Sequence, residues 1–131
     1  MRIPIVALVV ALGAVACGKS GGGSSAGRDA IIAAWKKAGL TVSAMTPDKS
    51  GAIGTDCVTG TVNGVDVALC TFAKPEDATA AKDKAYAWIG NNVPTGSALV
   101  SARTLLAVAD RKSADPSGRT INTITKAFTG K

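Results

Sequence analysis

The feature that most restricts the fold is an Asn63-Gly64 dipeptide between two five-residue segments rich in valine. Asn-Gly favours the two-residue type I′ turn, because the twist of this turn matches that of two antiparallel strands. Such a turn pairs residues symmetrically about itself, so Cys57, six residues before Asn63, faces Cys70, six residues after Gly64. Counting outward from the turn makes the two cysteines a non-hydrogen-bonded pair, in which side chains are closest. We therefore expect a disulfide-clamped hairpin.

The disulfide expected between Cys57 and Cys70 has two interpretations. Strand alternation puts both cysteines on the face that carries Thr59, Thr61 and Asp66, which is the less apolar face of the hairpin. An exposed disulfide there would suit a redox switch or a disulfide exchanger. Exchangers, however, usually hold their cysteines a few residues apart at a helix start, whereas twelve residues separate this pair. A structural clamp is our main interpretation, and redox chemistry is the alternative.

Helical and strand periodicities around the hairpin predict an α+β fold. The first helix should be capped by Asp29, the second should begin at Pro75, and the third should follow a cap at Asp115. A tight connection at Ala102-Arg103 should join the last two strands. The expected helices span 29–38, 75–89 and 116–128, and the expected strands outside the hairpin span 40–45, 98–101 and 104–109. Three helices packed on a mainly antiparallel sheet then form one globular domain over residues 28–131.

The first seventeen residues have the order of a secretory signal peptide. Met1 and Arg2 provide a positive start, residues 3–16 form a 14-residue apolar stretch, and Cys17 follows small residues. The apolar stretch is short for a membrane-spanning helix, which needs roughly 20 residues. We therefore expect residues 1–16 to be a signal peptide and the mature protein to be exported.

The end of this segment resembles the lipobox of bacterial lipoproteins, whose last four positions are occupied here by Ala14, Val15, Ala16 and Cys17. The resemblance implies lipidation of Cys17, cleavage before it and anchoring to a membrane. It departs from the usual pattern because the first lipobox position is most often Leu. The Ala-x-Ala spacing also fits an ordinary signal peptidase, which would cut the same bond. Gly18 lacks the charge that retains lipoproteins at an inner membrane, so in a source with two membranes the resemblance favours the outer membrane, facing the periplasm.

A Gly/Ser-rich stretch follows the lipobox cysteine. Residues 17–27 are therefore expected to be a lipidated Cys and a flexible tether. Ten such residues have an r.m.s. length of about 17 Å, which would hold a small domain just clear of the lipid headgroups.

Composition excludes most catalytic and metal-binding classes. The chain has 131 residues, 15 Lys and Arg against 9 Asp and Glu, three Cys and no His. It therefore lacks the commonest general base and zinc ligand, and three cysteines cannot form a four-cysteine zinc site. A P-loop-like pattern between Gly13 and Ser20 is followed by a Gly/Ser run rather than by a helix, so we expect no nucleotide. We expect no catalytic residue, metal or cofactor, and a binding or structural domain rather than an enzyme.

Positive charge is concentrated toward the carboxyl terminus. The last 29 residues have a net charge of +4, which suggests a basic face for an anionic envelope component, either lipid headgroups or glycan. An ordinary solvated surface is the alternative. The candidate contact residues are Arg103, Arg111, Lys112, Arg119 and Lys126. Only five aromatic residues are present, which argues against nucleic acid. The expected partners are a membrane, through the anchor, and an envelope protein or anionic lipid or glycan.

Overall fold

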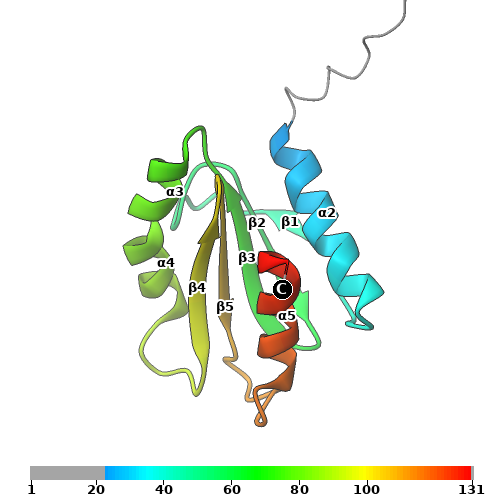
Figure 1. The fold of residues 1–131 in the computed structure, drawn as a ribbon. Coiled ribbons are helices and arrows are strands. Elements are labelled where there is room, and N and C mark those ends of the chain that lie inside the picture. Colours follow the sequence, from blue (N-terminus) through cyan, green and yellow to red (C-terminus); the bar gives the residue numbers. More distant parts are fainter. Residues whose placement is uncertain (1–22, 131) are drawn as a thin grey trace, which may run out of the picture.

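A computed structural model describes residues 23–130 of the chain, so the predicted signal peptide, lipobox and Cys17 lie outside the described residues. Five strands form one sheet in the order β1-β2-β3-β5-β4, and every neighbouring pair is antiparallel. The elements are α2 (Gly23–Lys37), β1 (Thr46–Pro47), β2 (Cys57–Val62), β3 (Val65–Thr71), α3 (Pro75–Ala80), α4 (Lys82–Ile89), β4 (Gly96–Ser101), β5 (Thr104–Ala109) and α5 (Arg119–Thr129). The predicted α+β class is confirmed (Figure 1).

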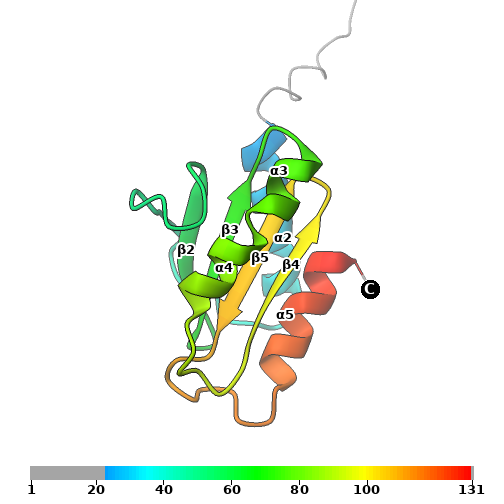
Figure 2. The same cartoon turned by 90° about the vertical axis from the view of Figure 1, so that its left-hand side faces the viewer.

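Helices cover both faces of the sheet. Consecutive helices α3 and α4 pack on one face, and α2 and α5 lie on the other (Figures 1 and 2). The helix predicted over 75–89 is therefore interrupted once, at Ala81. Pro75 begins it and Gly90 ends it, as predicted. The inner surface of α3 and α4 is rich in alanine, so these helices approach the sheet closely.

The face under α2 and α5 holds the bulkier core. Trp35 of α2 is fully buried, and its indole Nε1 donates a hydrogen bond of 3.0 Å to the carbonyl oxygen of Ile124 in α5. Both helices pack on valine and leucine side chains of the three inner strands. The hydrogen bond satisfies a buried donor and also fixes α2 beside α5.

The hairpin has the predicted register, and Cys57 is bonded to Cys70. Their Cα atoms are 4.0 Å apart. The sequence predicted that the disulfide would lie on the less apolar face of the hairpin. It is nevertheless buried, because α3 and α4 cover that face. The two cysteine residues are 3% and 0% exposed. Burial of this kind favours a structural clamp over a disulfide that exchanges with external thiols.

Helix α2 begins at Gly23, six residues before the predicted cap at Asp29. The last residues assigned to the tether, 23–27, are therefore helical. Extending a helix from a packed turn requires no new nucleation, so weak helix formers can still join it. The predicted termination at Gly39, which has a φ of +91°, is confirmed, and α2 stops at Lys37, one residue before the predicted end at 38.

The strand predicted over 40–45 is an interrupted extended segment. Val42 forms an isolated antiparallel bridge with Val62, and β1 then pairs Thr46 with Thr59. The segment from Val42 to Thr46 is therefore one residue longer than the segment from Thr59 to Val62 that it pairs with. Such an extra residue on one strand is a β-bulge. The alternation of apolar residues indicated extended backbone but could not reveal the extra residue.

Two buried carboxylates position the start of α5, which lies three residues later than predicted. The Asp115 carboxylate accepts hydrogen bonds from the backbone N–H groups of Thr120, at 3.1 Å, and Ile121, at 2.8 Å. Asp110 accepts from the N–H groups of Ala114, at 2.7 Å, and Asp115, at 2.9 Å. Asp115 thus caps the helix, as predicted. It lies in the preceding loop, four residues before Arg119, and not directly before the first helical residue.

Gly60 should be intolerant of a side chain. A Cβ added there would lie 2.5 Å from Met45 Sδ, 2.8 Å from Ser43 Oγ and 3.1 Å from the backbone carbonyl oxygen of Ala44, all in the bulged segment. Gly60→Ala should therefore lower the free energy of unfolding by about 1–3 kcal/mol through overpacking. Gly27→Ala is the matched control, because nothing lies within 4 Å of its added Cβ in α2. Urea unfolding should show the control unchanged or stabilised by up to about 1 kcal/mol, and equal stability of both variants would contradict the close packing of the bulged segment against Gly60.

Candidate functional site

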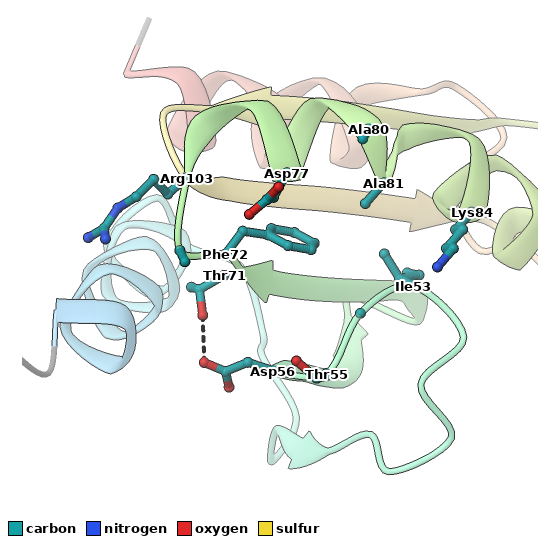
Figure 3. A pocket seen from close by; sticks show the side chains of 12 residues that line it. Ile53, Thr55, Asp56, Thr71, Phe72, Asp77, Ala80, Ala81, Lys84 and Arg103 are labelled. Atoms are coloured by element: carbon teal, nitrogen blue, oxygen red, sulfur yellow. Dashed lines mark hydrogen bonds between the residues drawn. The ribbon is translucent and has the colours of Figure 1, made fainter.

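A groove of about 700 Å³ opens between the α3–α4 pair and the loop that leads into β2 (Figure 3). It lies at the end of the sheet where β3 stops and where β4 turns into β5. We call it the polar groove. Its lining residues are Ile53, Gly54, Thr55, Asp56, Thr71, Phe72, Ala73, Asp77, Ala80, Ala81, Lys84 and Arg103.

Asp56 is the most firmly held polar group of this groove. Its Oδ2 accepts a hydrogen bond of 2.7 Å from the Thr71 hydroxyl, and its Oδ1 lies 2.8 Å from Nη1 of Arg28. The hydrogen bonds from Thr71 and Arg28 hold the pKa of Asp56 below its ordinary value. The carboxylate therefore stays ionised at neutral pH, which suits a fixed hydrogen-bond acceptor and not a general acid.

The disulfide holds this acceptor in place. Asp56 lies opposite Thr71, one residue further from the turn than the Cys57–Cys70 pair. The Thr71 N–H donates a 3.0 Å hydrogen bond to the Asp56 carbonyl oxygen. The covalent bond thus lies next to the pair that carries the carboxylate. A clamp at this position restricts the separation of the two chain segments that form one wall of the groove.

The remaining groups give the groove an apolar floor and a rim of both charges. The Phe72 ring lies in the middle, and Ile53 approaches it from the facing loop (Figure 3). The Asp77 carboxylate points toward the ring from α3, while Lys84 and Arg103 lie at opposite ends. Such a lining suits an occupant with some apolar surface and both positive and negative groups, as a short polypeptide segment has.

The five basic residues predicted to form one anionic contact surface are not brought together. Arg103 occupies the β4–β5 turn at the polar groove, whereas Arg111 and Lys112 follow the other end of β5. Six strand residues separate these ends, which corresponds to about 20 Å. Arg119 and Lys126 lie on α5. The sequence alone did not reveal this separation. The chain runs the full length of β5 between Arg103 and Arg111, which places them at opposite ends of the sheet.

Arg111 is already engaged by neighbouring groups. Its Nη1 lies 3.0 Å from Oδ2 of Asp66, its Nη2 donates to the Trp88 carbonyl oxygen, and its guanidinium carbon is 4.4 Å from the centroid of the Trp88 ring. Trp88 is only partly buried. Arg111 and Trp88 both line a second hollow of about 400 Å³. The ion pair with Asp66 and the cation–π contact with Trp88 hold the Arg111 guanidinium at the wall of this hollow.

Sequence reasoning missed Asp56, Thr71 and Arg28 as site residues. A signal for the first two was available, because extending the hairpin register by one step beyond Cys57 and Cys70 pairs Asp56 with Thr71. Arg28 carried no such signal. Its contact with Asp56 depends on how α2 packs across the sheet.

Replacement of Asp56 should change the pH dependence of stability. Because the folded state lowers the pKa of Asp56 from the ordinary 3.8, its stabilising effect is present at neutral pH and is lost as pH falls through the folded-state pKa. The Asp56 side chain is 51% exposed, so solvent screens its ion pair. Asp56→Asn should therefore lower the free energy of unfolding by less than about 1 kcal/mol at pH 7, and the difference should shrink in acid.

Urea titrations of the two proteins at several pH values provide this measurement. The control is Asp83→Asn, since the exposed Asp83 on α4 makes no ion pair or side-chain hydrogen bond within residues 23–130. A constant difference between wild type and Asp56→Asn across the acid range would contradict the assignment.

Comparison of the chain with protein-family models, curated proteins and solved structures found no match. None of the helices within residues 23–130 is long and apolar enough to cross a membrane. Within the same residues, no cluster of three or more His, Cys, Asp or Glu could hold a metal ion.

Proposed function

We propose that this protein is an exported, lipid-anchored lipoprotein of the cell envelope, whose folded domain is a non-catalytic binding module. The polar groove is its ligand site, and a short polypeptide segment of an envelope partner is the occupant. The anchor is Cys17, attached through the residues that precede α2. In a source with two membranes, the domain faces the periplasm from the outer membrane.

The observation that carries this proposal is the fixed Asp56 carboxylate at the rim of the groove, next to an apolar floor. Asp56 is held by Thr71 and Arg28, and a disulfide next to it stiffens the wall. Preformed polar groups around an apolar surface favour binding, because little ordering is left to occur when a ligand enters. The lowered pKa of Asp56 argues against its use as a proton donor.

The order of a positive start, an apolar stretch, small residues and Cys17 supports the anchor. An oxidised Cys57–Cys70 pair agrees with export, since disulfides persist mainly outside the reducing cytosol. Two or three acyl chains are sufficient for stable anchoring, whereas one is marginal.

The intact mass of the protein, extracted from the membrane fraction of its host, tests the anchor. We expect a chain that begins at Cys17, carries acyl chains and gains two alkylated thiols only after reduction. Cys17→Ser should abolish acylation and leave the disulfide intact. A mature mass without lipid would make the protein a soluble secreted one and refute the anchor.

Site-specific photo-crosslinking in the same envelope tests the groove. A photoreactive amino acid at Ala80, which lines the groove, should give a discrete crosslinked protein. The same group at Ala87, an exposed α4 position outside the groove lining, is the control and should not. Reversing the rim charges with Lys84→Glu and Arg103→Glu should remove the Ala80 product. Identical products from both positions, or turnover of an envelope substrate by the purified domain, would contradict the proposal.

A further inference from the structure

The two helical layers differ in charge. Helices α2 and α5 together carry five basic side chains and one acidic, a net of +4, whereas α3 and α4 carry two basic and three acidic, a net of −1. The two pairs lie on opposite faces of the sheet (Figures 1 and 2). Among the four helices, positive charge is therefore concentrated on the face that α2 and α5 cover, although Arg28 of α2 is paired with Asp56.

Four exposed side chains make up this surface, which we call the basic face: Lys36, Lys37, Arg119 and Lys126. Lys36 and Lys37 follow Trp35, whose indole is hydrogen-bonded to α5. Arg119 and Lys126 are seven residues, or about two helical turns, apart and so share one side of α5. Neither salt bridge within residues 23–130 involves any of the four.

Helix-end stabilisation does not explain the whole basic face. Lysine residues in the last turns of α2 and α5 interact favourably with the negative ends of the helix dipoles. Arg119, by contrast, occupies the first turn of α5, where a positive charge is unfavourable by itself and where the capping Asp115 carboxylate supplies the compensating negative charge. Neither salt bridge of residues 23–130 uses Arg119, so its charge is free to meet an anionic group outside the molecule.

Covalent connectivity keeps the start of α2 close to the proposed anchor. Cys17 precedes Gly23, the first residue of α2, by six residues, which span at most about 22 Å when fully extended. The start of α2 would thus remain within about 22 Å of an acylated Cys17. Lys36 and Lys37 lie about 20 Å further along α2, so a domain that lies with α2 and α5 along an anionic bilayer would bring Lys36, Lys37, Arg119 and Lys126 to it.

We propose that the basic face docks on anionic phospholipid headgroups of the membrane that holds Cys17, an inference that rests on the proposed function for the anchor. Docking on this side directs α3, α4 and the polar groove away from the bilayer, because they lie on the opposite face of the sheet. The anchor holds the domain at the membrane, and the basic face sets its orientation so that the groove opens to the aqueous compartment.

Vesicle binding by an unlipidated chain tests the basic face separately from the anchor. The chain would start at Gly18, which keeps every described residue, and the probes would be phosphatidylcholine vesicles with and without about one third phosphatidylglycerol. Binding should require phosphatidylglycerol and should weaken between low and physiological salt. Substituting Lys36, Lys37 and Lys126 by Gln should weaken it roughly 100-fold, at about fivefold for each charge.

A charge-matched triple variant provides the control. Substituting Lys49, Lys74 and Lys82 by Gln removes the same charge outside the basic face and should weaken binding less than about threefold. Replacement of Lys36, Lys37 and Lys126 by Arg should retain binding. Equal losses in the two Gln variants, equal binding to neutral vesicles or no binding would overturn the proposal.

Tighter binding to soluble polygalacturonate at equal charge concentration would assign the face to glycan. These vesicle measurements use an unlipidated chain and do not depend on the anchor. If Cys17 is not lipidated, only the intact mass of the protein from its host would show it.

Discussion

The rest of the structure depends on the register in which β2 pairs with β3. The Asn63-Gly64 turn sets that register, and the Cys57–Cys70 bond makes a slip of the strands impossible without breaking a covalent bond. A shift by one residue would exchange the two faces of β2 and move the cysteines and valines to the wrong layers. One local interaction therefore decides which side chains meet α3 and α4 and which meet α2 and α5.

Covering both faces of the sheet gives the domain two different surfaces. The alanine-rich α3 and α4 lie over the disulfide and border the polar groove. On the opposite side, α2 and α5 pack over the bulky core through Trp35 and expose lysine and arginine. The sheet thus separates a groove with charges of both signs from a predominantly basic face, and each surface can contact a different partner.

Local sequence signals predicted much of the fold. The turn, the disulfide, the second hairpin at Ala102-Arg103 and the helix boundaries at Pro75 and Gly90 all follow from neighbouring residues. The bulge, the early start of α2 and the burial of the disulfide depend on packing between distant segments. The candidate site was less predictable for the same reason. Of its central residues, Asp56 and Thr71 could have been inferred from the hairpin register, but Arg28 could not.

Hydrogen exchange at the Thr71 amide tests most directly whether the clamp maintains the site, because this N–H donates to the Asp56 carbonyl oxygen at the groove wall. The measurement compares the oxidised protein with a variant in which Cys57 and Cys70 are both replaced by Ala. The account predicts that Thr71 exchanges much faster in the variant while Leu69 and Leu106, at the centre of β3 and β5, stay protected. Equal protection of Thr71 in both proteins would show that the groove wall does not depend on the disulfide and would contradict the account.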